Sequence, residues 1–414
     1  MSSVSPCPMQ ADEIPENVPA DRVYDFDLFN MDLKDGYQEA IMRLQHPDRP
    51  TLIWTPRNGG HWIATRADFV TEAFRDPIQF TSKMVLIPRE AGEKYNFIPS
   101  HLDPPTHTPY RALVDTVLNL RQIRNLEKRI REISIDLIEP LVARGQSNFT
   151  IDYADQFPIR VFMAMVELPM EDAPILVRYS NTIVRPPGNT KAEKMASFEG
   201  AIQGFYKYLD PILNERRGKG GRDVMSIVID SEVNGKPLPH PEALNITANL
   251  LLAGLDTVAS FLNFVMIFLS RNPAHVKQLV DDFDLIPRAV EELVRRFPVV
   301  ADARTIGEDV DYDGVTLKRG DMILLPTALK GLSSEVNEDP WTVDFHRARP
   351  HHNTFGDGHH RCAGMHLARL ELTITLQEWL SRIPLFHMTE GSAPEYMSGI
   401  ASTVRNVRLE WQPG

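Results

Sequence analysis

One short segment of the chain combines residue types that suit the binding of a metal-containing group. Its pattern is Phe355-Gly356-x-Gly358-x-His360-x-Cys362-x-Gly364. The glycines permit backbone conformations that other residues resist. An amphipathic helix is predicted to begin directly afterwards, so we expect Cys362 at a helix N-terminus, among unpaired N–H groups and the positive end of the helix dipole. That position favours the thiolate, which is the form of cysteine that binds metals.

A thiolate surrounded by N–H donors is what a haem iron needs from an axial cysteine. The alternative for Cys362 is a free cysteine packed as a small hydrophobic residue. A cluster of histidines, His351, His352, His359 and His360, suggests instead a zinc site in a non-haem hydrolase. Adjacent histidines rarely converge on one metal and no HExxH motif is present, so a solvated loop is the better interpretation of His351 and His352.

A second pair of residues suits proton transfer. Asp256 and Thr257 lie within a nearly apolar stretch, residues 250–269. A carboxyl group can supply protons and a hydroxyl group can hold a chain of water molecules. A capping or surface role is the alternative, but it suits an Asp inside an apolar helix poorly. The stretch is long enough to cross a bilayer, whereas its carboxylate favours the buried central helix of a large soluble protein.

Three further motifs accompany the cysteine segment in a fixed order. Glu292 and Arg295 form an ExxR pair, whose spacing places both side chains on one helix face. The other two are Ala253-Gly254-Leu255-Asp256-Thr257 and His107-Thr108-Pro109-Tyr110-Arg111. Each motif is weak alone, and ExxR alone is more often solvated surface charge, but four motifs in sequence argue against coincidence.

Together these motifs resemble the cytochrome P450 family. FGDGHHRCAG resembles its haem-binding loop, and the likeness extends from about Val23 to Trp411. Stretches such as EELVRRFPVVADAR and HLARLELTITLQEWLSRIP resemble the bacterial camphor-hydroxylating members. The resemblance implies a mainly α fold with small β-sheets, a single large domain around a buried haem b. Residues 1–20 would then be a flexible arm and residues 21–414 the catalytic domain.

The resemblance also implies an activity. It is that of a cytoplasmic, monomeric haem-thiolate monooxygenase that hydroxylates an unactivated C–H bond of a compact terpenoid-like substrate of camphor, cineole or ionone type. The reaction uses O2 and two electrons from a [2Fe–2S] ferredoxin with its reductase. The alternative is a haem-thiolate sensor or binding protein without turnover, against which the Asp256–Thr257 pair counts.

The resemblance further assigns roles to single residues. Cys362 is implied as the iron ligand, and the other implied haem contacts are His360, Arg111, His107, Arg304, Asp302, Phe355, Gly356 and Gly364. The implied oxygen-activating residues are Asp256, Thr257 and Gly254, with Arg185 ion-paired to Asp256 in an inactive arrangement. Glu292 and Arg295 are implied to be structural. The implied ferredoxin-side cations are Arg111, Arg349 and Arg361.

The implied substrate pocket consists of Tyr95, Leu86, Val184, Asn249, Leu252, Val300 and Ile400. Most of these side chains are aliphatic, which suits a compact terpenoid. Leu86, Asn249 and Leu252 depart from the camphor-hydroxylating pattern, so the substrate itself stays open. Lys83 stands where that pattern has an acidic residue, which argues against a potassium site.

Periodicity predicts the elements that must position these residues. A hairpin is expected over 51–66 and loops over 81–105, with strands in 309–326 and 403–411. Helices are expected over 67–76, 116–142, 192–217, 243–272, 285–297 and 366–383.

The composition is that of an ordinary soluble globular protein. The chain has 414 residues, a net charge of −12 and 43% hydrophobic residues. Its two cysteines, Cys7 and Cys362, exclude a disulfide framework or a Cys-rich zinc site. The acidic balance argues against nucleic-acid partners and anionic membrane surfaces, because phosphate binding needs a basic surface.

Overall fold

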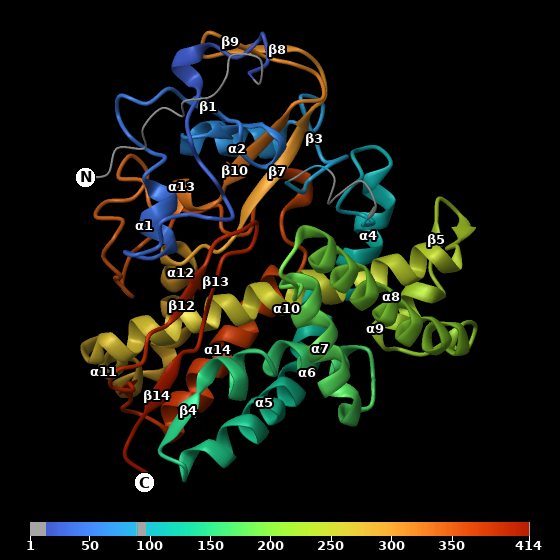
Figure 1. The fold of residues 1–414 in the computed structure, drawn as a ribbon. Helices are drawn as coiled ribbons and strands as arrows, with labels where there is room; N and C mark the ends of the chain where they lie inside the picture. The colour runs from blue at the N-terminus through green and yellow to red at the C-terminus, as the bar shows by residue number, and fades with distance from the viewer. Residues whose placement is uncertain (1–13, 88, 90–96, 414) are drawn as a thin grey trace. The chain divides into compact units, whose positions relative to one another are not determined.

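The structure is a computed structural model that describes residues 14–87, 89 and 97–413, apart from the side chains of Val184, Lys191 and Leu255. The chain falls into two compact units, each assembled from separated stretches. Unit 1 comprises residues 1–108, 291–362 and 396–403, and unit 2 comprises residues 109–290, 363–395 and 404–414. The predicted architecture, mainly helical with small sheets, is confirmed (Figure 1).

Unit 1 is built on a five-stranded sheet in the order β1-β2-β10-β7-β3. Its strands are β1 (Leu52–Thr55), β2 (His61–Ala64), β3 (Phe80–Thr81), β7 (Ala301–Ile306) and β10 (Met322–Pro326). The predicted hairpin is present, with Trp54 paired to Trp62 across β1 and β2. β10 runs parallel to β2 and antiparallel to β7, and all five of its residues are buried. Such a continuous apolar run is typical of a central strand.

Unit 1 also contains short helices. They are α1 (Tyr37–Met42), α2 (Ala67–Arg75) and α13 (Ala328–Gly331). α2 packs against β10 and α13, and α13 packs against α1. α2 buries Phe69 and Phe74 in the same core cluster as Trp54 and Trp62. Each large apolar side chain buried in this way contributes about 1.5–3 kcal/mol. A separate hairpin of β8 (Val310–Tyr312) and β9 (Val315–Leu317) turns at Asp313-Gly314, where both residues have positive φ.

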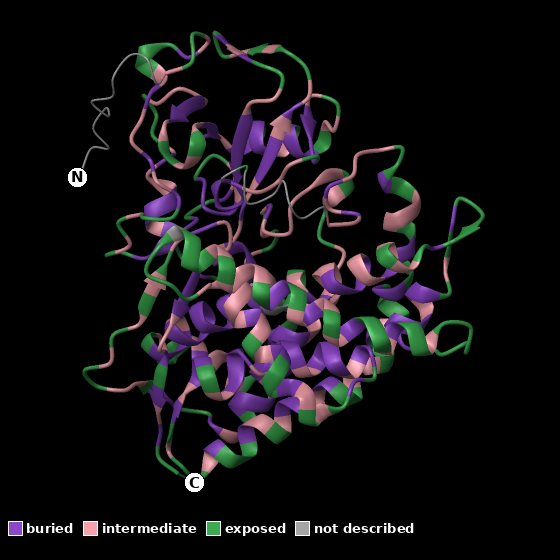
Figure 2. Ribbon diagram, turned by 45° about the vertical axis from the view of Figure 1, so that its right-hand side comes forward, coloured by how far each residue is buried: buried purple, intermediate pink, exposed green. Residues whose placement is uncertain are grey.

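Unit 2 is helical. Its helices are α5 (Leu120–Val142), α6 (Phe157–Met165), α7 (Ala173–Val184), α8 (Lys191–Arg216), α9 (Val224–Ile229), α10 (His240–Arg271), α11 (Pro273–Asp281) and α14 (Met365–Arg382). Two more, α4 (His107–Val117) and α12 (Ile286–Arg296), lie across the boundaries of the two units. α10 packs against α6, α7, α8, α9 and α14, which makes it the central helix of the unit. The helices are buried on one side and exposed on the other (Figure 2).

The remaining sheets are small. β4 (Gln146–Asn148), β11 (His387–Met388) and β14 (Arg408–Glu410) form a three-stranded sheet in the order β11-β14-β4. Two hairpins pair β5 (Glu232–Val233) with β6 (Lys236–Pro237) and β12 (Glu395–Met397) with β13 (Thr403–Arg405).

One predicted helix is divided in the structure. The helix expected over 116–142 is α5 together with the end of α4, and Asn119 separates the two. Its side-chain Oδ1 accepts the N–H groups of Arg121 and Gln122 at 2.9 and 3.0 Å. An Asn that caps the N-terminus in this way starts a new helix even though the apolar periodicity runs on.

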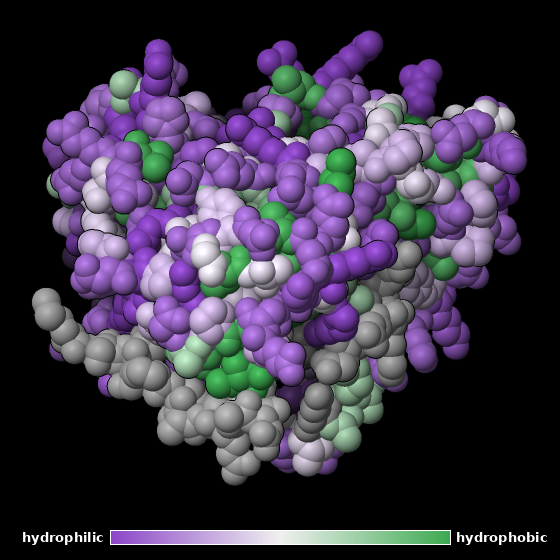
Figure 3. Space-filling view, turned by 90° about the horizontal axis from the view of Figure 1, so that it is seen from above, coloured by the Kyte–Doolittle hydropathy of each residue, from purple (hydrophilic) through white to green (hydrophobic). Residues whose placement is uncertain are grey.

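By length and composition, α10 could cross a membrane, a test that the core helix of a soluble protein also passes. About two thirds of its apolar window is buried inside the structure (65%). The face of the molecule drawn in Figure 3 is largely hydrophilic, with small apolar groups scattered over it. These observations favour the prediction of a buried central helix.

Candidate functional site

The segment that carries Cys362 is a tight loop in unit 1. The Cys362 N–H donates to the Phe355 carbonyl oxygen at 2.9 Å, which closes the loop. Gly356 and Gly358 have φ angles of 67° and 66°, in the left-handed region that favours glycine. A Cβ at Gly358 would lie 2.2 Å from the carbonyl oxygen of Phe74, so only glycine lets the loop approach α2 so closely.

Asp357 anchors this loop to α2. Its Oδ1 accepts the Gly358 N–H at 2.8 Å and its Oδ2 lies 2.9 Å from Arg75 Nη2. Burial opposes ionisation of Asp357, but the hydrogen bonds from Arg75 and the Gly358 N–H outweigh it and lower its pKa. The Cys362 thiol is exposed on the anchored loop. Gly364 is the N-cap residue of α14, so the thiol precedes the first helical residue, Met365, by three positions.

Imidazole and guanidinium groups gather in the same unit. The rings of His107 and His360 lie 4.4 Å apart between centroids. The Arg304 side chain is 4% exposed, and its Nη1 lies 3.0 Å from Asp302 Oδ2. The Arg304 guanidinium also lies over the ring of Phe74, at 5.2 Å from its centroid. Unit 1 therefore brings His107 to His360 and Arg304 to Asp302.

His101 belongs with these groups, and sequence reasoning missed it. The ring is buried, and its Nδ1 accepts the Phe97 N–H at 2.9 Å, which assigns the proton of the neutral ring to Nε2. Burial lowers the pKa of His101, and the nearby Asp302 and Arg304 act on it in opposite directions. Within the part of the chain that the structure describes, the buried Nε2 has no hydrogen-bond partner. A buried donor of this kind fits a bound anionic group.

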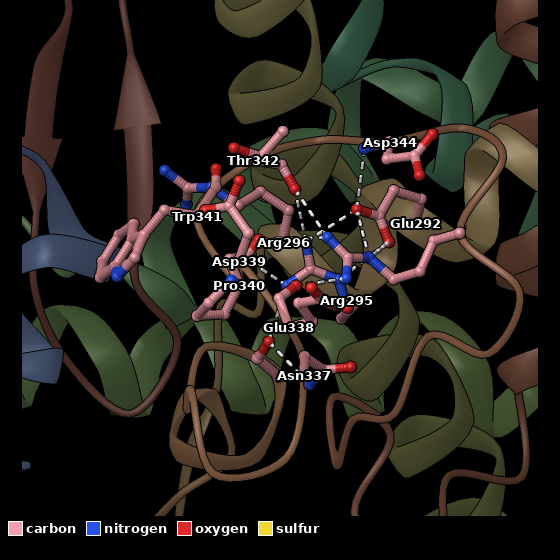
Figure 4. Close-up of polar contacts among 12 residues, drawn as sticks. Glu292, Arg295, Arg296, Asn337, Glu338, Asp339, Pro340, Trp341, Thr342 and Asp344 are labelled. Atoms are coloured by element: carbon pink, nitrogen blue, oxygen red, sulfur yellow. Dashed lines mark hydrogen bonds and ion pairs between the residues drawn. The ribbon is translucent and has the colours of Figure 1, made fainter.

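The ExxR pair forms a buried ion cluster in unit 1 (Figure 4). Arg295 Nε and Nη2 donate to the two Glu292 carboxylate oxygens at 2.8 and 2.7 Å. Arg347 Nε donates to the same carboxylate at 3.0 Å. The other guanidinium N–H groups of Arg295 donate to the carbonyl oxygens of Gly331, Pro340 and Thr342 at 2.7, 2.6 and 3.1 Å. All five N–H donors of this guanidinium are thus used, which fixes the segment before the cysteine loop.

Unit 2 holds the acid–alcohol pair on α10. Arg185, the residue after α7, donates from Nη2 to Asp256 Oδ1 at 2.5 Å. Asp256 Oδ2 and Arg185 Nε are also buried, and neither has a hydrogen-bond partner among the described residues. Burial raises the pKa of Asp256, although the charge and the hydrogen bond of Arg185 oppose the rise. A carboxyl group in this state suits the uptake and release of a proton.

Thr257 lies on the more exposed side of α10. Its Oγ1 donates to the Ala253 carbonyl oxygen at 3.1 Å, and both Ala253 and Gly254 are exposed. Asn249, Ala253 and Thr257 follow one another at four-residue spacing and therefore share one helix face. α10 thus carries its buried carboxyl and its accessible hydroxyl at adjacent positions.

The other predicted site residues fall into separate groups. Val300 and Ile400 lie on paired segments of unit 1, since Val300 bridges Ala401 and the Ala301 N–H donates to the Ile400 carbonyl oxygen at 2.9 Å. Leu86 is partly buried in unit 1, and Leu252 is partly buried on α10. Tyr95 lies outside the described residues, and the side chain of Val184 is not described.

The remaining predicted residues are cationic. Arg111 lies on the part of α4 that belongs to unit 2, where its Nε is 2.8 Å from Asp115 Oδ1. Arg349 and Arg361 are exposed. Across the described ranges, no group of three or more His, Cys, Asp or Glu side chains could hold a metal ion, so the zinc alternative gains no support.

Comparison with known proteins gives a consistent result. The family model for "Cytochrome P450" matches residues 278–409. The chain is 30% identical to "Probable cytochrome P450 127A1" of Sinorhizobium fredii over 97% of this chain and 98% of that protein. It is 29% identical to "Mycinamicin IV hydroxylase/epoxidase" of Micromonospora griseorubida over 95% of each chain. Its structure matches that of CYP101J2 with a TM-score of 0.88, at 39% identity, over 96% of this chain and 99% of the other.

Proteins of the matched family bind haem b, and the residues of this chain fit that group. The anchored loop of unit 1 presents an exposed thiol, a group of the kind that can ligate a haem iron. Haem propionates are anionic and need donors. Unit 1 offers the Arg304 guanidinium and the His107–His360 pair, and it also holds the buried His101 Nε2, which lacks a partner among the described residues.

Proposed function

The chain belongs to the cytochrome P450 family, and from that premise we propose that it is a ferredoxin-dependent monooxygenase that hydroxylates a compact terpenoid-like substrate. One oxygen atom of O2 enters a C–H bond and the other becomes water, with two electrons from a [2Fe–2S] ferredoxin. The protein acts as a cytoplasmic monomer. When bound, haem supplies the oxygen-activating chemistry.

The residues of unit 1 hold and orient the cofactor in this proposal. Cys362 ligates the iron through its exposed sulfur. Arg304, His107, His360 and His101 bind the propionate groups, a role that the family resemblance also assigns to Arg111. Asp302 orients Arg304 through the 3.0 Å ion pair. Phe355, Gly356 and Gly364 shape the loop. The Glu292–Arg295 pair holds the segment that precedes the loop in place.

The residues of unit 2 deliver protons. Asp256 takes up a proton because burial favours its neutral form, and Arg185 holds the carboxylate away from the reaction between turnovers. Release from Arg185 lets Asp256 pass the proton to water held by the Thr257 hydroxyl. Gly254 keeps the backbone beside that hydroxyl uncovered.

Substrate selection rests on aliphatic side chains with few polar groups. The family resemblance assigns the apolar contacts to Leu86, Val184, Leu252, Val300 and Ile400. The Tyr95 phenol and the Asn249 amide are the groups that can donate to a ketone or ether oxygen. Exposed Arg349 and Arg361 give an acidic ferredoxin a local positive surface on an acidic protein.

The observation that carries this proposal is the buried, incompletely hydrogen-bonded carboxyl of Asp256, held by one contact with Arg185. A sensor or binding protein has no use for a carboxyl group kept ready to exchange a proton. A relative whose name is that of a hydroxylase/epoxidase also favours turnover.

The test is a panel of monoterpenoids and norisoprenoids added to the haem-loaded protein. At least one compound should shift the haem spin state and should then yield a hydroxylated product with a [2Fe–2S] ferredoxin, its reductase and NADH. A panel without any spin-state shift would contradict the terpenoid assignment. Tight binding without product would instead favour the sensor alternative.

A further inference from the structure

A second ion pair in unit 2 is formed by the buried Asp155 and the partly buried Arg405. Arg405 Nη1 and Nη2 donate to the two Asp155 carboxylate oxygens at 2.6 and 2.8 Å, which is a bidentate pair. The Asp155 side chain is 8% exposed and that of Arg405 is 22% exposed. Neither residue belongs to a motif that the sequence singles out, and they lie 250 positions apart.

This pair acts on Asp256. Besides burial and Arg185, two further charges change the pKa of Asp256: Asp155 raises it and Arg405 lowers it. The charged groups that act on this carboxyl therefore come from three segments outside α10. They are Arg185 after α7, Asp155 before α6, and Arg405 at the end of β13.

Thr150 holds these segments in place. It begins η4 (Thr150–Ala154), a π-helical turn that ends just before Asp155. Its Oγ1 donates to Asn263 Oδ1 at 3.0 Å, and Asn263 lies two turns along α10 from Asp256. The same Oγ1 accepts the N–H of Val407, two residues after Arg405, at 3.2 Å. One side chain thus joins α10 to the two segments that carry Asp155 and Arg405.

We propose that Arg405 is a positioning residue for Asp256, on which it acts by balancing the charge of Asp155 in the bidentate pair. The inference rests on the proposed function, which gives Asp256 its proton-delivery role. With Arg405 present, the Asp155 charge is balanced and Arg185 governs Asp256. Without Arg405, an unbalanced carboxylate would act on Asp256 and favour its neutral form.

The sign of the effect distinguishes this role from a merely structural one. Removing the cation with Arg405→Gln should favour protonated Asp256. Removing the anion with Asp155→Asn leaves Arg405 unbalanced and should favour ionised Asp256. The double variant removes both charges and should resemble the wild type. Loss of packing alone would not produce opposite signs.

The experiment is an infrared difference titration of the haem-loaded protein, in which the protonated carboxyl band of Asp256 is assigned by its loss in Asp256→Asn. At a fixed pH, Arg405→Gln should raise the ratio of protonated to ionised Asp256 about threefold or more, and Asp155→Asn should lower it by a similar factor. Arg405→Lys, which keeps the charge, should stay within about twofold of the wild type. If Arg405→Gln does not fold, Asp155→Asn and the double variant carry the test with the same predicted directions.

Arg216→Gln is the matched control. Arg216 pairs with Asp223 at nearly the same burial, with side chains 18% and 5% exposed, and it is not one of the charges named above as changing the pKa of Asp256. Shifts of the same sign in both single variants, an unchanged ratio, or an equal shift in Arg216→Gln would overturn the inference. The readout needs no substrate, so a failure to turn over terpenoids would refute the proposed function and leave this result standing.

Discussion

Two ion clusters, one in each unit, remove charged side chains from water, and they differ in how those side chains are hydrogen-bonded. In unit 1 the Arg295 guanidinium uses all its donors, and Glu292 accepts from Arg295, Arg347 and the Asp344 N–H. In unit 2 a single 2.5 Å contact joins Arg185 to Asp256, and one polar atom of each side chain is buried with no partner within the described ranges.

The two clusters therefore differ in how completely their polar atoms are hydrogen-bonded. A buried charge is costly unless its hydrogen bonds are complete, and in a complete cluster the loss of any member leaves several groups unsatisfied. Separating the partners of an incomplete pair breaks fewer hydrogen bonds and therefore costs less free energy. Substitutions in the unit 1 cluster should therefore mainly lower the free energy of unfolding. Substitutions in the unit 2 pair should mainly lower product formation.

Arg295→Lys should have the largest effect on stability. Lysine keeps the charge but lacks the planar fork, so it cannot serve Glu292 and the carbonyl oxygens of Gly331 and Pro340 together. We expect a loss of about 3–5 kcal/mol, measured as a lower midpoint of thermal or denaturant unfolding. Arg129→Lys, at a half-exposed pair with Glu132, is the control and should change stability by less than about 0.5 kcal/mol. An unfolding midpoint equal to that of the wild type would refute the structural assignment.

His61 is a third case, a buried titratable side chain that stays neutral. It lies in β2 at 1% exposure, and burial lowers its pKa to about 4 from the usual 6.5. The unfolded chain therefore binds the proton more readily, so the stability due to neutral His61 is complete above pH 6.5 and is lost as the pH falls towards 4. The loss should reach on the order of 3 kcal/mol.

The measurement for His61 is the unfolding free energy against pH, compared with His61→Gln. The variant cannot titrate there, so its curve should be flatter across this window. Identical slopes in the two proteins would show that another group accounts for the acid sensitivity.

Asp256→Asn should change stability little, by about 1 kcal/mol or less, because the carboxylate it removes is incompletely hydrogen-bonded. Product formation should fall by roughly two orders of magnitude, the usual contribution of a general acid. Product per electron consumed is the measurement, with the carbon monoxide spectrum as a check that the cofactor site is intact. Asp281→Asn, at an exposed pair with Lys277, is the control. A large loss of stability with unchanged product per electron would contradict the roles assigned to the two clusters.

Thr257→Ala should have the smallest effect on stability, within about 0.5 kcal/mol, because its hydroxyl makes one local contact with the Ala253 carbonyl. Oxygen consumption should continue while product per oxygen drops. Thr257→Ser keeps the hydroxyl and should restore the coupling. Coupled product formation by Thr257→Ala would mean that the hydroxyl has no part in proton delivery.

Sequence periodicity predicted the long elements well. The central helix expected over 243–272 is α10, and the hairpin, α2, α8 and α14 also lie where expected. The break at Asn119 was missed, because a cap is a single side-chain contact that does not interrupt the apolar pattern. β7 was missed too, since its residues, ADARTI, show little apolar character and become a strand only by pairing with β10 and β3.

Motifs located the site residues that are close in sequence, such as Glu292 with Arg295. The Arg185–Asp256 contact was expected from the family resemblance, and the structure contains it. His101 and the Asp155–Arg405 pair were missed, because burial and charge pairing between distant segments leave no local pattern. Such groups become visible only when the structure shows which buried polar atoms have partners.

The most direct test of this account concerns the Cys362 thiol. The reduced, haem-loaded protein under carbon monoxide should show the red-shifted Soret band typical of thiolate-ligated haem, and Cys362→Ser should lose that band. The variant should keep the free energy of unfolding of the wild type, to within about 1 kcal/mol. A wild-type spectrum without the red shift, or a Cys362→Ser spectrum that retains it, would contradict the assignment of Cys362 as the iron ligand.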